Sequence, residues 1–183
     1  MHVTMRRAPG RASLRSERLA LAIKAQIAAA VRRGVGVVEY SIQHDHVHLI
    51  VEADDRLRAS RGMQLLFSRI AFEVNRIERR HGKLFHDRHH RRALTSPRQV
   101  RNCFIYVLFN DRKHAATFAE LTRLEGWIDP CSSARWFAGW DPRAQPPPPT
   151  DEPSPLARPK TWLAQAGWKR AGGPIRFNEL PRR

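Results

Sequence analysis

Residues 35–52 read V-G-V-V-E-Y-S-I-Q-H-D-H-V-H-L-I-V-E, two apolar runs separated by the short polar segment Q-H-D-H. Valine and isoleucine are frequent in both runs, which is typical of strands that enter a hydrophobic core. Strands joined by so short a connection pair in the antiparallel sense. This stretch therefore predicts two adjacent strands, at 35–42 and 46–53, in the middle of an antiparallel sheet.

Side chains alternate across a strand, so the second of these strands separates its histidines from its core residues. His46 and His48 are predicted to share one face with Ile50, whereas the valine and leucine side chains between them face the core. Two imidazoles on one face can bind one metal ion, although paired surface histidines are also common in proteins without a metal. The pair alone leaves both interpretations open.

The flanking sequence predicts a β-α-β-β-α-β-α order. Such an order indicates an α+β fold, with helices packed on one face of an antiparallel sheet and the histidine face open or half-covered. Pro97 and Ser96 mark the start of the last helix, as a first-turn proline and an N-cap. The predicted elements besides the central pair are a strand at 2–6, a helix from Ser16 to Arg33, a helix at 59–80, a basic strand within 83–94 and a helix from Ser96 onward.

The last predicted helix has two separate stripes. Tyr106 and Asn110 are one helical turn apart and are expected to point the same way. Tyr106 could be an ordinary residue of an amphipathic helix, but it lies on the polar stripe and not on the apolar one. The apolar stripe is Val100, Phe104, Val107 and Leu108, and the polar stripe is Gln99, Asn102, Tyr106, Asn110 and Lys113.

The chain is strongly basic, with 33 Lys and Arg against 17 Asp and Glu and a formal net charge of +16. Arginine binds phosphate oxygens through two parallel hydrogen bonds, so this balance favours a nucleic-acid partner. A high-GC genome could also enrich arginine at the surface, but it would not by itself produce a net charge. The candidates for contact with a DNA backbone, chosen by position and charge, are Arg69, Arg76, Arg79, Arg88, Arg91 and Arg92.

The composition changes after Trp140. Residues 1–140 are predicted to form the main domain, 141–160 a proline-rich extended linker, and 161–183 a tail that docks on the domain or on DNA. No apolar run reaches the roughly 20 residues that span a bilayer. The N-terminus lacks the apolar segment of a secretory leader, and Cys103 and Cys131 suit a reducing compartment, so a cytoplasmic location is expected. The tail residues expected to dock are Trp162, Leu163, Trp168 and Phe177.

Two other kinds of H-x-H protein fit less well. Metallo-β-lactamase-like sites have the pattern H-x-H-x-D-H, whereas the aspartate here precedes the pair, in H-D-H-V-H. An amidohydrolase barrel needs far more residues than this chain contains. Neither class explains the positive charge.

Three segments in this order resemble the single-tyrosine HUH transposases, and among them the REP-associated tyrosine transposases of bacterial chromosomes. The segments are E-Y-S-I-Q-H-D-H-V-H-L-I-V, F-H-D-R-H-H-R-R-A-L and R-N-C-F-I-Y-V-L-F-N-D-R-K-H, and the resemblance covers residues 1–118. It implies a ferredoxin-like fold, an HUH motif at His46-Val47-His48, a nucleophile at Tyr106 and a third metal ligand at Asn110. Asp111 departs from the family, since many relatives have proline there.

The resemblance also implies an activity, which is cleavage and rejoining of single-stranded DNA at palindromic hairpins through a 5′-phosphotyrosine intermediate. It implies one divalent ion, Mg²⁺ or Mn²⁺, held by His46, His48 and Asn110. The expected state is a monomer or a homodimer in the bacterial cytoplasm, associated with the nucleoid when it acts. Two alternatives remain: a non-catalytic nucleic-acid-binding module descended from such an enzyme, and an HUH replication initiator or relaxase-like nickase.

Overall fold

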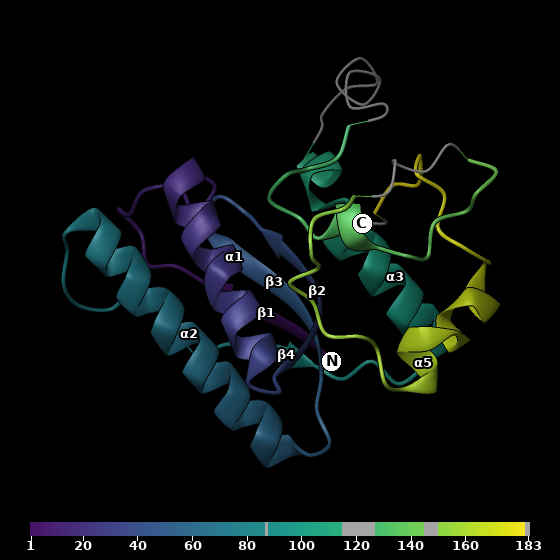
Figure 1. The fold of residues 1–183 in the computed structure, drawn as a ribbon, viewed down its shortest axis with the longest axis horizontal. Coiled ribbons are helices and arrows are strands. Elements are labelled where there is room, and N and C mark those ends of the chain that lie inside the picture. The colour runs from purple at the N-terminus through teal and green to yellow at the C-terminus, as the bar shows by residue number, and fades with distance from the viewer. Residues whose placement is uncertain (87, 115–126, 145–149, 182–183) are drawn as a thin grey trace.

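The computed structural model describes residues 1–86, 88–114, 127–144 and 150–181 (Figure 1). None of the helices in these ranges is long and apolar enough to cross a membrane. The principal elements are β1 (His2–Arg6), α1 (Glu17–Arg32), β2 (Gly36–Ile42), β3 (His46–Glu52), α2 (Arg56–Glu78), β4 (His90–Arg92) and α3 (Pro97–Leu108).

The strands form one four-stranded sheet in the order β2-β3-β1-β4, in which every neighbouring pair is antiparallel. This is the predicted ferredoxin-like α+β fold, and the predicted fold class is confirmed. The helix expected at 59–80 begins earlier, at Arg56, because the Asp55 side chain accepts a hydrogen bond from the Arg58 backbone amide. It ends at Glu78, since Arg79 takes a left-handed conformation with φ of 52°.

Helices lie on both sides of the sheet. α1 and α2 lie side by side over one face, as expected, whereas α3 lies on the other side (Figure 1). The apolar stripe of α3 packs there against Val38 of β2 and Ile50 of β3. The expectation that the helices pack on one face therefore holds for α1 and α2 but not for α3. α3 half-covers the histidine face.

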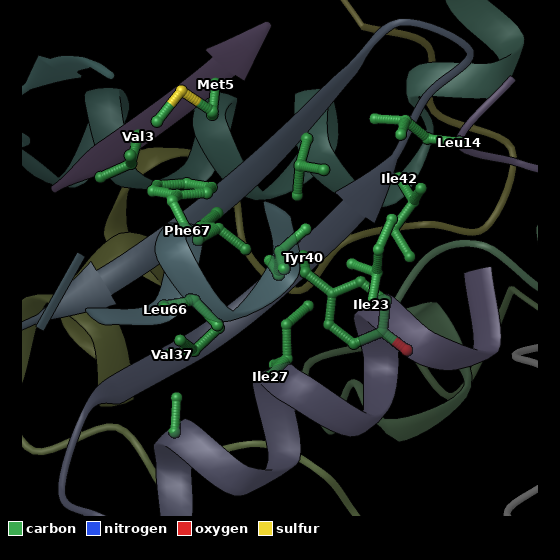
Figure 2. Close-up of a cluster of buried hydrophobic side chains, with 14 of the residues drawn as sticks. Val3, Met5, Leu14, Ile23, Ile27, Val37, Tyr40, Ile42, Leu66 and Phe67 are labelled. Carbon is green, nitrogen blue, oxygen red and sulfur yellow. The ribbon is translucent and has the colours of Figure 1, made fainter. Parts of the chain in front are cut away.

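The main core fills the space between the sheet and helices α1 and α2. Figure 2 shows Ile23 and Ile27 of α1 packed beside Val37 and Tyr40 of β2. Tyr40 is completely buried, and within the described residues its hydroxyl has no hydrogen-bond partner. Burial, helped by the nearby Glu39 carboxylate, raises the pKa of Tyr40. Because Tyr40 packs in this core and pairs with Leu49, it lies on the face of the sheet opposite to His46 and His48.

A second apolar cluster joins α3 to the C-terminal tail. Trp168 is only 2% exposed, and its ring packs edge-on against Phe104 of α3 with 5.5 Å between ring centroids. Phe177 packs in the same cluster, whereas Trp162, in the short helix α5 (Trp162–Gln165), stays 51% exposed. The tail residues thus complete the layer that covers the α3 side of the sheet, and Trp162 is the one aromatic of the expected docking set that remains outside.

Trp168→Ala should lower the free energy of unfolding by about 3–5 kcal/mol, because it leaves a large cavity among aromatic side chains. Trp162→Ala removes the same side chain from a largely exposed position and is the matched control, with an expected change below about 1 kcal/mol. Urea unfolding of both variants measures the difference. Equal stabilities would show that the tail does not belong to the folded core.

The proline-rich segment also contacts the domain. The Ala157 backbone amide donates a hydrogen bond of 2.8 Å to the Val37 carbonyl, and Leu156 packs against the main core. The interpretation of 141–160 as a segment outside any core is therefore wrong for Leu156. β2 is an edge strand of the sheet, and Ala157 satisfies one of its outward backbone groups, as residues 131–133 do further along the strand.

Glu39 of β2 is a buried acid. It is 5% exposed and accepts a hydrogen bond from the Ser133 hydroxyl, which ties β2 to the chain after α3. Burial raises the pKa of the Glu39 carboxyl from 4.5 to about 8, although the hydrogen bond from Ser133 acts in the opposite direction. Folding therefore holds this carboxyl in its protonated form at neutral pH.

Glu39→Gln should stabilise the protein increasingly as pH rises from 4.5 to about 8. In this interval the unfolded wild type has lost the Glu39 proton and the folded protein has kept it, so wild-type stability falls by up to about 1.4 kcal/mol per pH unit. Below this interval both states are protonated, so the difference between variant and wild type should stop changing with pH. Urea unfolding at several pH values measures it, and a difference that does not change with pH would contradict the prediction.

Candidate active site

His46 and His48 turn their side chains toward each other on the α3 side of β3. Their Nε2 atoms lie 2.8 Å apart, and the two rings meet edge-on. His48 is only 3% exposed, whereas His46 is partly accessible to solvent. Strand alternation thus places the pair as the sequence predicts.

The remaining ring nitrogen of each histidine is held by another polar group. His46 Nδ1 lies 2.6 Å from the Asp45 carboxylate. His48 Nδ1 lies 3.0 Å from Thr4 Oγ1 and 3.1 Å from His2 Nε2. Histidine ligands of metal ions are usually oriented in this way, with the nitrogen away from the metal bonded to a carboxylate or another polar group.

The charges around the pair follow from burial and from these contacts. Burial lowers the pKa of His2 to about 4, helped by the N-terminal ammonium and by neighbouring cationic side chains. His2 is therefore neutral near pH 7, and its Nε2 can accept a hydrogen bond from His48 Nδ1. Burial opposes ionisation of Asp45, but the hydrogen bond and charge of His46, together with Arg6, lower the pKa of Asp45.

Tyr106 lies against this cluster. Its hydroxyl is 3.4 Å from His48 Nε2, and its ring centroid is 5.0 Å from that of His48 and 5.8 Å from that of His2. α3 carries it there, beginning at Pro97 with the Ser96 hydroxyl accepting from the Gln99 amide. Tyr106 is half-buried. The two residues that the resemblance assigned to one reaction centre are therefore in contact.

Asn110 does not continue α3 as predicted. The helix ends at Leu108, and Asn110 begins the 3-10 helix η1 (Asn110–His114). Asparagine and aspartate at 110 and 111 favour such an end, since their side chains compete for backbone hydrogen bonds. Asn110 is 1% exposed, and within the described residues neither atom of its amide has a hydrogen-bond partner.

The direction of α3 indicates toward which end of the sheet the chain continues to Asn110. Val100 lines one pocket with Ile50 and Glu52, and Tyr106, further along α3, contacts His48. α3 therefore runs antiparallel to β3, and the residues after Tyr106 continue toward the His46 end. A buried amide without a partner costs about 1–3 kcal/mol, which a ligand to its oxygen would offset.

These groups fit a divalent cation in the nature of their donors. The Nε2 atoms of His46 and His48 lie 2.8 Å apart, and Asn110 has a buried amide oxygen. In the part of the chain that the structure describes, no three His, Cys, Asp or Glu side chains are grouped to hold a metal ion. Amide, phosphate and water oxygens are ligands that Mg²⁺ accepts in proteins beside any nitrogen donors.

The predicted arginines separate into two groups. Arg92 of β4 pairs directly with His2 of β1, so the two side chains share the histidine face. Arg91 points to the other face, and Arg88 lies exposed just before β4. Three of the candidates, Arg69, Arg76 and Arg79, lie on or at the end of α2, which covers the opposite face, and Arg76 is paired with Glu73.

Sequence reasoning missed His2 and Thr4. Their strand was predicted at 2–6, and alternation alone places both side chains on one face. What the sequence lacks is the register that pairs Thr4 with His48 and His2 with Ile50. A histidine two positions from a threonine in the first strand was the available signal.

Comparison with solved structures finds a REP-associated tyrosine transposase bound to a REP hairpin, with a TM-score of 0.52 and 15% sequence identity. The match covers 72% of this chain and 74% of that one. No protein-family model matches the chain. No curated protein matches it either. The chain therefore shares the fold of that transposase, and the resemblance read from the sequence is supported at the level of fold.

Proposed function

We propose that this protein cleaves and rejoins single-stranded DNA at or beside palindromic hairpins, with Tyr106 as the nucleophile. One observation carries the proposal: the Tyr106 hydroxyl lies 3.4 Å from His48, beside the His46–His48 pair. The only other tyrosine, Tyr40, is buried on the opposite face. The fold shared with a tyrosine transposase supports the same assignment.

In the proposed reaction the Tyr106 oxygen attacks the scissile phosphorus and loses its proton. A phosphorus–oxygen bond to tyrosine forms as the bond to the 3′ oxygen breaks, and that oxygen takes up a proton. The products are a 5′-phosphotyrosine and a free 3′-OH. The number of phosphoester bonds is unchanged, so the reverse reaction can rejoin the strand without ATP.

His46, His48 and Asn110 would hold one Mg²⁺ or Mn²⁺ ion. When bound, such an ion neutralises charge on the phosphoryl oxygens and favours the tyrosine phenolate. Thr4 and His2 lie within hydrogen-bond distance of His48 Nδ1 and would hold the ring proton there, so that Nε2 would face the ion. Asp45, 2.6 Å from His46 Nδ1, would do the same for His46.

The net charge of +16 supports DNA as the partner. The protein that shares this fold is described as bound to a REP hairpin, which supports a hairpin substrate here. Arg92 is the best-placed backbone contact, since it lies beside His2 on the catalytic face. Arg69, Arg76, Arg79, Arg88 and Arg91 would bind more distant phosphates of the same DNA.

The test uses a pool of hairpin oligonucleotides whose single-stranded arms are randomised. With Mg²⁺ or Mn²⁺, the protein should cut some members and form a covalent adduct that survives denaturation. Sequencing of the products identifies the cut site, and chelation by EDTA should stop cutting. A protein that binds the pool and never cuts it would be the non-catalytic module instead.

A further inference from the structure

A pocket of about 600 Å³ opens beside Tyr106 on the side away from His46, and His2 also lines it. The polar stripe of α3 continues into it, because Gln99 and Asn102 line its wall. The proposed chemistry uses Tyr106 and Asn110 of this stripe and leaves these two amides without a role. The volume lies within the roughly 300–1,000 Å³ typical of ligand pockets.

The C-terminal segment forms the opposite wall. Leu180 and Glu179 line the pocket, and Arg101 of α3 holds this segment in place. The Arg101 guanidinium donates two hydrogen bonds of 2.7 and 2.8 Å to the Glu179 carboxylate, and a third of 3.1 Å to the Gly173 carbonyl. The one carboxylate in the wall is therefore neutralised, and the wall is fixed to the helix that carries Tyr106.

The remaining lining combines three kinds of surface. Leu94 and Ile105 provide apolar contact, Arg92 and Arg98 bring positive charge, and the two amides offer hydrogen bonds. An apolar surface, amide groups and cations together match the three parts of a nucleotide, which are a flat base, its polar edge and its phosphate.

The side-chain amides of Gln99 and Asn102 differ in the hydrogen bonds that they make within the protein. The Gln99 carbonyl accepts from the Thr95 backbone amide at 2.8 Å and from the Thr95 hydroxyl at 3.2 Å, which leaves its NH₂ group as a donor. Asn102 is exposed, and among the described residues its amide has no hydrogen bond to protein. Asn102 can therefore pair both its donor and its acceptor with the edge of an unpaired base.

We propose that this pocket binds the unpaired base of the nucleotide next to the scissile phosphate, through the Asn102 and Gln99 amides. The inference rests on the proposed function, because Tyr106 itself lines the pocket and a nucleotide held there would lie beside the attacking hydroxyl. It adds base recognition to a site otherwise built for phosphate chemistry. Arg92 and Arg98 would hold the phosphate of that nucleotide.

The test combines Asn102→Ala with single abasic sites, introduced one at a time on each side of the cut in an oligonucleotide that the pool selects. In the wild type, loss of one flanking base should slow cleavage roughly 5- to 150-fold, the range of one bidentate amide–base pair. Asn102→Ala should slow cleavage of the intact oligonucleotide by a similar factor and be insensitive to removal of that same base. Gln64→Ala removes an exposed amide from α2 and should cut like the wild type.

Two results would overturn the proposal. In the first, Asn102→Ala cuts the intact oligonucleotide at the wild-type rate. In the second, each abasic site slows cleavage by Asn102→Ala by the same factor as it slows cleavage by the wild type, at every position. A wild type that cuts no pool member would contradict the proposed function instead. The pocket is then judged by fluorescence anisotropy with a pool-selected binder, where Asn102→Ala and the abasic sites should weaken affinity in the same pattern. Equal affinities of wild type and variant would reject it.

Discussion

Tyr106→Phe should abolish strand cleavage and the covalent adduct while hairpin binding survives. The substitution removes the only hydroxyl proposed to attack phosphorus, and a phenyl ring cannot replace it. Binding should persist because phosphate contacts by arginine supply most of the affinity, and no charge is lost. Time courses on denaturing gels and anisotropy titrations measure the two properties separately.

Tyr40→Phe is the matched control, since the chain contains two tyrosines. The Tyr40 hydroxyl is buried with no hydrogen-bond partner in the described residues, so its removal should leave stability nearly unchanged or raise it. Cleavage should also be unchanged, because the residue lies on the opposite face of the sheet. Wild-type cutting by Tyr106→Phe, or loss of cutting in Tyr40→Phe with intact folding, would contradict the assignment.

His46→Ala should slow cleavage by roughly 100-fold or more, since the proposed cation supplies several kcal/mol of transition-state stabilisation. His48→Ala should do the same, with some loss of stability because His2 and Thr4 lose their shared partner. His44→Ala is the control, because His44 is exposed on the turn before β3. Hairpin binding should remain close to wild type in all three variants.

Binding of Mn²⁺ to the DNA-free protein gives a second measurement that does not depend on cleavage. Calorimetric titration should show weaker binding for His46→Ala and unchanged binding for His44→Ala. If His46→Ala binds Mn²⁺ as tightly as the wild type and still cuts at the wild-type rate, the histidine pair is not the metal site.

Local patterns predicted most of the elements that build the site. Alternation in 46–52 placed His46 and His48 together, and the Ser96-Pro97 signature located the start of α3 within a residue. These features depend on near neighbours in the chain, so a single sequence contains them. The end of α3 was harder, because Arg112, just after it, is held by Phe177 of the tail through a hydrogen bond to its carbonyl.

Long-range contacts account for what the sequence did not predict. The place of His2 depends on strand register, and the pocket beside Tyr106 depends on Arg101 and Glu179, which are 78 positions apart. The arginine candidates show the same limit. Charge and spacing selected Arg76 and Arg92 alike, but only the packing of the layers separates α2 from the catalytic face.

Peptide mapping of the protein–DNA adduct tests the central claim most directly. After cleavage, nuclease trimming and trypsin digestion, the nucleotide should be attached to the peptide of residues 102–112, at Tyr106, through a 5′ phosphate. Correspondingly, label placed 3′ of the cut should stay with the protein, and label placed 5′ of it should be released. A nucleotide on the peptide of residues 34–56, which contains Tyr40, or an attachment through the 3′ end would contradict the proposed mechanism.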